Sequence, residues 1–457
     1  MPPSDAPQIL ARPAGEARVL SYVQERLWYL HQLHPTNPVY NMPFVSRLRG
    51  DLSVPAFTEA LRAVVDRHEI LRTVFLVVNG QPRPFPLKKG RAPLTEVDLR
   101  HLPASDREQE AQRFASEEAA RSFDMTREPM FRCVLYRLSD DEFWFVHSAS
   151  HMVFEGGSVA ALYNDLAAAY EQALAGRTIE LPPLPYQYAD FSAWQRRSLS
   201  AEREAQLTEY WKVQLANPST LDLPFDFPMP PVNTFQGERW FFHLDRASLE
   251  AIKTRFPAVS PYRLMAAAFN LFLNGISGST DLFIGSPFMP YRGLEGLVGF
   301  FVNTVVLRTS VAGDPSFREL LLRTEQVVRL AKEHCELMFH KVVEAVQPPR
   351  DPSGTPLFQV NFRAPGRPPY PALQLPGIRA TPADYLDNGT SKFNLSLEVE
   401  TSVGEPSFFE YRTDLFRRST IEHMRLDFEQ LLRAVAEQPD KRISELAVIR
   451  DILRRYR

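Results

Sequence analysis

The segment of the sequence best suited to chemistry is SASHMVFEGGS, residues 148–158. It carries His151, a carboxylate four residues later at Glu155, two glycines and then Ser158. A neutral imidazole accepts a proton near pH 7 or orients an attacking amine. Glu155 can hold the turn by pairing with an arginine, and the glycines let backbone segments approach closely. The plainer interpretation is an ordinary strand-turn-helix corner with a hydrogen-bonded histidine.

Other signatures of catalysis are missing from the sequence. It has no Gly-rich phosphate loop ending in Lys-Ser or Lys-Thr, no dinucleotide fingerprint, no nucleophile elbow and no zincin helix. His31 and His34 are spaced for one helical face, and we interpret them as helix surface rather than as a metal site. We therefore expect neither a metal ion nor a bound cofactor.

A predicted hairpin places His151 at the edge of a sheet. Residues 131–151 contain two runs rich in Val, Phe, Tyr and Trp around a Ser-Asp-Asp turn. A helix over 159–174 follows the glycines, with Ser158 as its N-cap. On a strand that ends at His151, Ser150 points to the opposite face, so Ser150 is a poor candidate for a nucleophile.

Both halves of the chain mix helices with strands. Apolar spacing predicts helices, and β-branched and aromatic runs predict strands. The other predicted helices lie near 20–33, 54–68, 108–121, 189–215, 245–256, 261–275, 315–346 and 417–436. The other predicted strands lie near 71–78, 239–244, 281–288, 299–310, 357–363, 392–399 and 406–411. This mixture favours an α/β (or α+β) fold of two-layer sandwiches over a barrel.

Length and composition exclude several classes of protein. At 457 residues the chain has room for two or three domains, and 44% hydrophobic with 23% charged residues is typical of a folded chain. A formal net charge of -3 gives no cationic field for nucleic acid or anionic lipid. The sequence lacks both an apolar run of about 20 residues and a signal peptide. The expectation is a soluble cytoplasmic protein without nucleic acid or membrane partners.

Several motifs together resemble one enzyme family. The 148–158 segment is similar to the HHxxxDG core motif of nonribosomal peptide synthetase condensation domains, which belong to the chloramphenicol-acetyltransferase-like superfamily. His151 falls on the second histidine of that motif, which the family uses in catalysis. Further blocks occur in the family's order: LSYVQERLWYL at 20–30, RHEILRTVF at 67–75, YADFSAWQR at 188–196, GSPFMPYR at 285–292, VGFFVNTVVLR at 298–308, SKFNLSL at 391–397 and YRTDLF at 411–416.

The resemblance implies an architecture. Family members fold as two chloramphenicol-acetyltransferase-like lobes in a V-shaped pseudo-dimer, with the active site in a tunnel between the lobes. Applied to this chain, it predicts a flexible leader at 1–17, an N-terminal lobe at 18–178, an inter-lobe linker at 179–234 and a C-terminal lobe at 235–457. The chain starts just before the first motif and stops just after the last, so we expect a free-standing, monomeric condensation enzyme.

The resemblance also implies an activity in natural product biosynthesis, such as that of antibiotics. A donor carrier protein presents an acyl or peptidyl thioester on its phosphopantetheine arm. An amine or hydroxyl acceptor, either a small molecule or a group on a second carrier protein, attacks the thioester and forms an amide or an ester. His151 is the expected general base, or else it positions the acceptor by a hydrogen bond.

This sequence departs from the family motif at two positions. Ser150 replaces the first histidine and Glu155 replaces the aspartate, whereas Gly156 is retained. In the family the aspartate pairs with an arginine. Arg308 is therefore the first candidate partner for Glu155, and Arg67 is the second.

Asn303 and Thr304 are candidates for the tunnel wall.

Two other functions stay open: a condensation-like domain that docks other enzymes without catalysis, and an acyltransferase that uses CoA thioesters.

Overall fold

The computed structural model of the chain describes residues 9, 11–13, 15–349, 351–365, 370–402 and 405–456. The chain divides into two units, and each unit takes segments from distant parts of the sequence. Unit 1 comprises Met1–Ser200, Tyr291–Phe301 and Pro369–Asn388, and unit 2 comprises Ala201–Pro290, Val302–Pro368 and Gly389–Arg457.

The division differs from the predicted contiguous lobes 18–178 and 235–457. Two segments of the second half belong to unit 1, because β11 (Arg379–Ala380) and β12 (Asp384–Tyr385) pair with β1 (Asn41–Arg49). The predicted linker 179–234 is shared between the units, which meet in sequence at Ser200 and Ala201.

The described part of the predicted leader is held against unit 1. Ile9 is buried in the hydrophobic core of that unit, and the backbone N–H of Arg12 donates to Asp190 Oδ1 at 2.8 Å. Residues 1–8, 10 and 14 lie outside the described residues.

Unit 1 is built on a mixed sheet that contains the predicted hairpin. Its strands in spatial order are β11, β1, β6 (Glu142–Ser150), β5 (Phe131–Arg137) and β4 (Leu94–Asp98), and β12 also pairs with β1. The helices are α1 (Tyr22–Leu33), α2 (Val54–Arg67), α3 (Ala104–Ala120), α4 (Ser158–Leu174) and α5 (Tyr188–Ser198), with short 3-10 turns at Pro38–Tyr40 and Glu69–Arg72.

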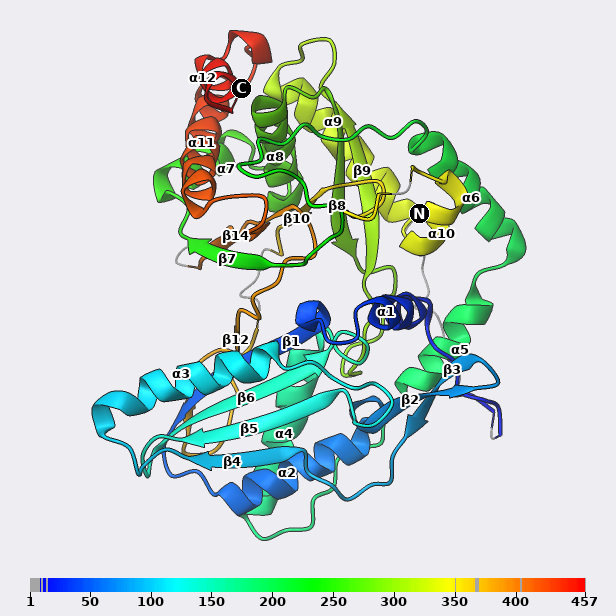
Figure 1. Cartoon of the computed structure of the whole chain (residues 1–457), viewed down its shortest axis with the longest axis vertical. Helices are drawn as coiled ribbons and strands as arrows, with labels where there is room; N and C mark the ends of the chain where they lie inside the picture. The colour runs from blue at the N-terminus through cyan, green and yellow to red at the C-terminus, as the bar shows by residue number, and fades with distance from the viewer. Residues whose placement is uncertain are drawn as a thin grey trace. The chain divides into compact units, whose positions relative to one another are not determined.

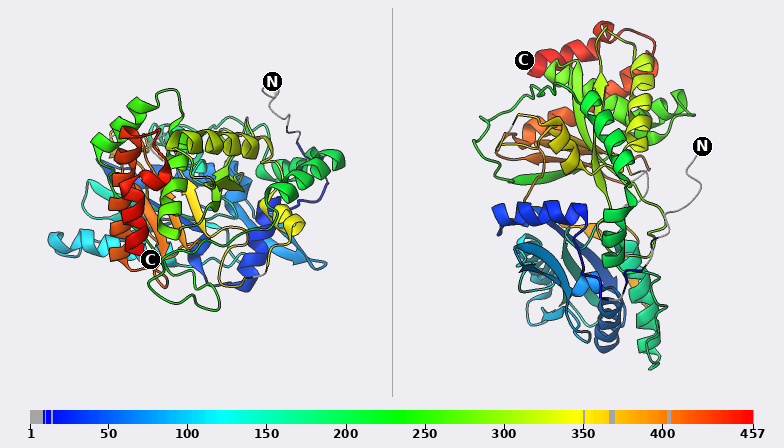
Figure 2. Two further views of the ribbon diagram at one scale, coloured as in Figure 1. Left: turned by 90° about the horizontal axis from the view of Figure 1, so that it is seen from above. Right: turned by 90° about the vertical axis from the view of Figure 1, so that its right-hand side faces the viewer.

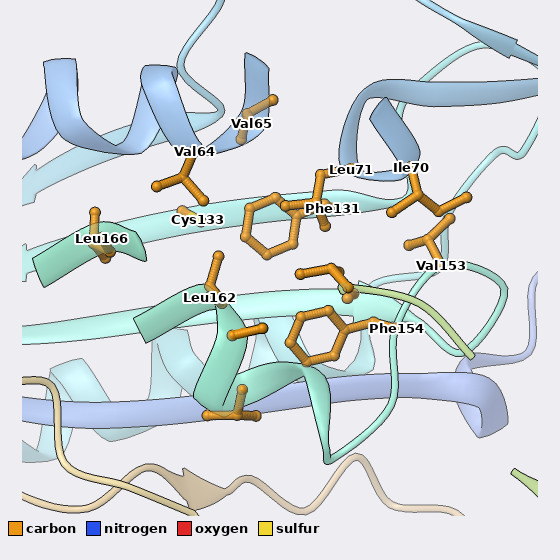
Figure 3. Close-up of a cluster of buried hydrophobic side chains, with 14 of the residues drawn as sticks. Val64, Val65, Ile70, Leu71, Phe131, Cys133, Val153, Phe154, Leu162 and Leu166 are labelled. Atoms are coloured by element: carbon orange, nitrogen blue, oxygen red, sulfur yellow. The ribbon is translucent and has the colours of Figure 1, made fainter. Parts of the chain in front are cut away.

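Alternating side chains of β6 divide this sheet into two covered faces. Phe143, Phe145 and Ala149 belong to the apolar cluster under α2 and α4. Trp144 and Val146 belong to the smaller cluster that packs against α3. Figure 1 shows α3 on one side of the sheet and α2 and α4 on the other. Figure 3 shows side chains of α2, α4, β5 and the turn after β6 meeting in the larger cluster.

A separate two-stranded ribbon completes unit 1. It consists of β2 (Thr73–Val78) and β3 (Gln81–Pro86), joined at Asn79-Gly80. Both turn residues have positive φ, 51° and 76°, as a tight hairpin turn requires.

Unit 2 contains the second sheet. Its strands in spatial order are β7 (Gly237–Phe242), β14 (Ser407–Arg412), β13 (Leu395–Glu398), β10 (Val360–Arg363), β8 (Asp281–Phe288) and β9 (Asn303–Ser310). The helices are α6 (Ala201–Gln214), α7 (Arg246–Arg255), α8 (Pro261–Ser277), α9 (Phe317–Glu333), α10 (Phe339–Val346), α11 (Arg418–Glu437) and α12 (Ala447–Tyr456), with a 3-10 turn at Ile443–Glu445.

The helices α8 and α11 bury one face of this sheet. Leu395 and Leu397 of β13 join Phe269 and Phe428 of the two helices in one apolar cluster. The last helix, α12, packs beside α8 and α11, as Figure 2 shows. The predicted mixed α/β fold is confirmed in both units.

Three predicted elements differ from the observed ones. The predicted helix 315–346 is broken into α9 and α10, and the predicted helix 189–215 is broken into α5 and α6. The predicted strand 299–310 begins only at Asn303, because the backbone of residues 299–301 belongs to unit 1 and bonds to side chains there. Among the described residues, no helix combines the length and the apolar composition needed to cross a membrane.

Candidate active site

His151 lies directly after the end of β6, in the turn that leads to α4. Its backbone N–H donates to the carbonyl of Tyr40 at 2.7 Å, which fixes the main chain at this point. The side chain is half-buried, and its ring centroid lies 4.6 Å from that of Phe300. The imidazole is therefore anchored through its backbone and contacts an aromatic ring from a distant segment.

The turn after His151 is closed by polar contacts. Ser150 Oγ accepts the N–H of Met152 at 3.2 Å, and Gln24 Nε2 of α1 donates to the carbonyl of Met152 at 2.8 Å. Ser150 itself is buried. Its hydroxyl stabilises the turn, and so the first departure from the family motif has a structural role here.

Glu155 binds a backbone group rather than either predicted arginine. Its Oε2 accepts the N–H of Phe301 at 3.0 Å. Ser158 contacts the same segment twice, because its Oγ donates to the carbonyl of Gly299 at 3.0 Å and accepts the N–H of Gly299 at 3.1 Å. The predicted N-cap role of Ser158 is wrong: α4 begins at Ser158 itself, and the hydroxyl is used by Gly299.

Tyr188 holds the same segment from the side of α5. Its hydroxyl donates to the carbonyl of Phe300 at 2.6 Å and lies 2.9 Å from Ser21 Oγ, at the start of α1. Burial raises the pKa of Tyr188 far above its usual range, so the phenol stays protonated as a donor. A side chain at position 299 would place its Cβ only 2.1 Å from the ring of Tyr188, which explains the glycine there.

The retained glycine of the motif serves a similar close approach. A Cβ on Gly156 would lie 3.0 Å from the ring of Tyr370, whereas a Cβ on Gly157 would make only an ordinary contact with Glu155. Tyr370 also packs edge-on against Phe44 of β1 at 4.7 Å. The segment 370–388 therefore packs directly against the motif loop.

The structure gives Arg308 and Arg67 different partners from those predicted. Arg308 Nε and Nη2 donate to the carboxylate of Asp281, and Nη1 donates to backbone carbonyls at the end of α6. Arg67 donates to Asp165 at 3.0 Å, and Asp165 also binds His68 at 2.7 Å. Arg308 thus joins β8 and β9, and Arg67 joins α2 and α4.

Asn303 binds the break between α9 and α10. Its Nδ2 donates to the carbonyls of Cys335 and Leu337, both at 2.9 Å, and its Oδ1 accepts the N–H of Phe339 at 3.0 Å. The buried amide is committed to these three backbone groups, while its neighbour Thr304 is half-buried.

A second histidine near the site, His147 on β6, has a different environment from His151. It is fully buried among the rings of Phe44, Phe131, Phe145 and Phe154. Burial lowers the pKa of His147 to about 3, so its imidazole is neutral at pH 7.

The contact of Phe300 with His151 is not evident from the sequence. A glycine followed by two aromatic residues is typical of the start of a strand, and the sequence predicts a strand there. In the described part of the chain, no cluster of three or more His, Cys, Asp and Glu side chains has the arrangement of a metal site.

A comparison of the sequence with family models agrees with the motifs described above. The sequence model described as "Condensation domain" matches residues 16–454. The chain belongs to the condensation-domain family. Its core motif, with Ser150 and Glu155, is therefore a variant within a sequence that the condensation-domain model matches over residues 16–454.

Relatives of this condensation domain are parts of peptide synthetases. The chain is 36% identical over 450 residues to one of the linear gramicidin synthase proteins of Brevibacillus parabrevis, covering 94% of this chain and 8% of the synthase protein. It is 37% identical over 461 residues to the phosphinothricin tripeptide synthetase PhsC of Streptomyces viridochromogenes, covering 99% of this chain and 42% of the synthetase. The chain thus spans less than half the length of these relatives.

Solved structures agree on the fold. The X-domain from teicoplanin biosynthesis superposes with a TM-score of 0.87 at 27% identity, over 96% of this chain and 99% of that one. A four-domain nonribosomal peptide synthetase bound to AMP and glycine superposes with a TM-score of 0.83 at 20% identity, over 95% of this chain and 34% of that one.

Proposed function

We propose that this condensation domain transfers an acyl or peptidyl group from a carrier protein to an amine or hydroxyl acceptor. The acceptor nitrogen or oxygen attacks the carbonyl of the phosphopantetheine thioester. A C–N or C–O bond forms, the C–S bond breaks, and the thiol of the arm leaves with a proton. The product is an amide or an ester, and the phosphopantetheine belongs to the carrier protein.

The observation that carries this proposal is the placement of His151. The imidazole is half-buried rather than enclosed, and it stands at a strand end with its backbone bonded to Tyr40. In the proposed reaction His151 accepts the proton of the acceptor or orients it by a hydrogen bond. General-base catalysis contributes about 10²–10⁴-fold to such a step, and orientation of two bound reactants contributes more.

The first test is intact-protein mass spectrometry of an acyl-loaded carrier protein mixed with the enzyme and a panel of amines and alcohols. We expect acyl loss that requires an acceptor and falls at least about 100-fold in His151→Ala. The acceptor that is consumed distinguishes an amide product from an ester product. Equal acyl loss in both proteins would remove His151 as the base, and acyl loss from free CoA thioesters would favour a CoA-dependent acyltransferase.

A second candidate is a docking domain without catalysis. Two observations favour it: the Ser150 and Glu155 replacements, and the fold match to the teicoplanin X-domain, which has also been solved in a complex with OxyB. A carrier protein that binds this chain without losing its acyl group to any acceptor would support the docking function.

A further inference from the structure

The contact between Phe300 and His151 is the part of the site that the family motif does not explain. The two ring centroids are 4.6 Å apart with an interplanar angle of 41°, and both side chains are half-buried. The aromatic ring lies against the imidazole at a tilt and restricts the directions in which that imidazole can turn. Aromatic pairs of this kind carry a measurable energy beyond the burial of their surface.

The backbone on both sides of Phe300 is fixed to unit 1. We call residues 299–301 the clamp segment. Ser158 binds the N–H and the carbonyl of its first residue, Tyr188 binds the carbonyl of Phe300, and Glu155 accepts the N–H of its last residue. The path of the clamp segment is therefore fixed at each of its three residues.

The two phenylalanines of the clamp segment have different environments. Phe301 is buried and packs against Tyr188 and Phe191, with ring centroids 5.3 and 4.9 Å apart. Phe300 contacts His151 instead. Because Phe301 is packed in the core of unit 1, the neighbouring Phe300 is held against the imidazole of His151.

We propose that Phe300 is a positioning residue for His151, and that Glu155 helps to orient the imidazole through the clamp segment. The extra methylene of Glu155, relative to the family aspartate, then has a purpose: it lets the carboxylate reach the N–H of Phe301. The proposal rests on the proposed function, in which His151 meets the acceptor.

The proposal makes a counterintuitive prediction for Glu155→Asp, which restores the family residue. The substitution withdraws the carboxylate by about 1.5 Å, the length of one C–C bond, and breaks a 3.0 Å hydrogen bond. We expect kcat to fall about 10-fold with the KM for the acyl carrier protein unchanged, because a misplacement of about 1 Å can cost up to 10²-fold. Glu155→Gln keeps the length and an acceptor oxygen, so it should retain more activity than Glu155→Asp.

Substitutions of Phe300 test the same contact from the other side. We expect kcat to fall about 3- to 10-fold in Phe300→Ala, with Phe300→Leu intermediate because it keeps an apolar contact but loses the ring. Phe85→Ala, the same change at an exposed phenylalanine of β3, serves as the matched control and should leave activity unchanged.

A spectroscopic readout separates this proposal from the proposed function. In protein labelled with ¹³C-histidine, the ring resonance of His151 is assigned by its absence in His151→Ala. We expect Phe300→Ala and Glu155→Asp to shift that resonance in the same direction, because the first removes the ring of Phe300 and the second moves it away from the imidazole. Glu155→Gln should leave it close to the wild-type position.

Two results would overturn the proposal: an unchanged His151 resonance in Glu155→Asp, or an unchanged kcat in Phe300→Ala. If no carrier protein and acceptor give turnover with the wild-type protein, the proposed function fails. The resonance of His151 in the two variants then decides alone whether Glu155 and Phe300 position it.

Discussion

Two histidines four residues apart, one within β6 and one directly after its end, show how far the local environment decides their chemistry. His151 stands at the strand end and is half-buried, whereas His147 is fully enclosed by aromatic rings. His147 Nε2 lies 3.3 Å from the hydroxyl of Tyr163, and its Nδ1 has no hydrogen-bond partner among the described residues. His147 is consequently a structural histidine that favours the neutral form.

This difference predicts an acid sensitivity that belongs to His147. Its folded pKa of about 3 lies below the unfolded value of 6.5, so the unfolded chain binds the extra proton. The contribution of His147 to the free energy of unfolding is complete above pH 6.5. It falls by about 2 kcal/mol between pH 7 and pH 5. Urea unfolding at both pH values should show that this part of the loss disappears in His147→Leu. The same change at exposed His423 should leave the loss intact, and an equal loss in all three proteins would refute the assignment.

The sequence supports some residue assignments better than others. The position of His151 at a strand end follows from the pattern of the hairpin, which the structure confirms at β5 and β6. The bond from Phe301 to Glu155 could not be predicted from residue types, because the donor is a backbone N–H, a group that every residue except proline carries. An arginine was expected because charge pairing can be recognised from a sequence, whereas a backbone bond to a residue 146 positions away cannot.

At the scale of elements, Asn303 explains why one predicted helix is two. The apolar spacing over 315–346 is continuous enough to predict a single helix, yet α9 ends at Glu333 and α10 starts at Phe339. The three backbone groups released by the break are taken up by the amide of Asn303 on β9. A compensation between distant elements of this kind leaves no periodic signal in the sequence.

Asn303→Ala should therefore reduce stability. It leaves two carbonyls and one N–H without their partner, and a loss of about 2–4 kcal/mol in the free energy of unfolding is expected. Chemical unfolding measures the loss, and hydrogen exchange should locate it at residues 334–339. Thr304→Val, on the adjacent half-buried residue, is the control and should change stability by less than about 1 kcal/mol. If Asn303→Ala unfolds like the wild-type protein, the amide has another role.

The strand β1 is a second element that the residue pattern does not predict. Its first six residues are all buried, so it lacks the alternation of a half-exposed strand, and it contains Pro43. No strand was predicted at 41–49, although β1 pairs with β6 along its whole length. The fold class can be predicted from the remaining elements, whereas the presence of β1 beside β6 cannot.

At the scale of the whole molecule, unit 1 depends on two segments that lie between the segments of unit 2 in the sequence. Its apolar core includes side chains from 291–301 and from 370–388, namely Leu294, Leu297, Val298, Phe301, Leu373, Leu375 and Ala383. Removing them opens cavities in a packed core and uncovers one edge of β1. Segments this far apart in sequence cannot be assigned to one unit by composition breaks.

Residues 1–200 expressed alone should consequently fail to fold cooperatively. We expect a broad transition in urea followed by circular dichroism, where the full chain gives a steep one, because the core and the sheet are both incomplete. Adding residues 201–457 as a separate chain should restore the steep transition. A cooperative transition in residues 1–200 alone would show that the later segments are dispensable.

The interleaving of the two units also bears on the exchange of parts between synthetases. A chimera joined at position 200 would inherit β1, the motif loop and His151 from one parent. It would inherit β11, β12 and the clamp segment with Phe300 from the other parent. In a chimera of that kind, residues from the two parents must fit together at three places: β11, β12 and the clamp segment. A chimera that keeps 1–200, 291–301 and 370–388 from a single parent is therefore the one expected to preserve the geometry around the histidine.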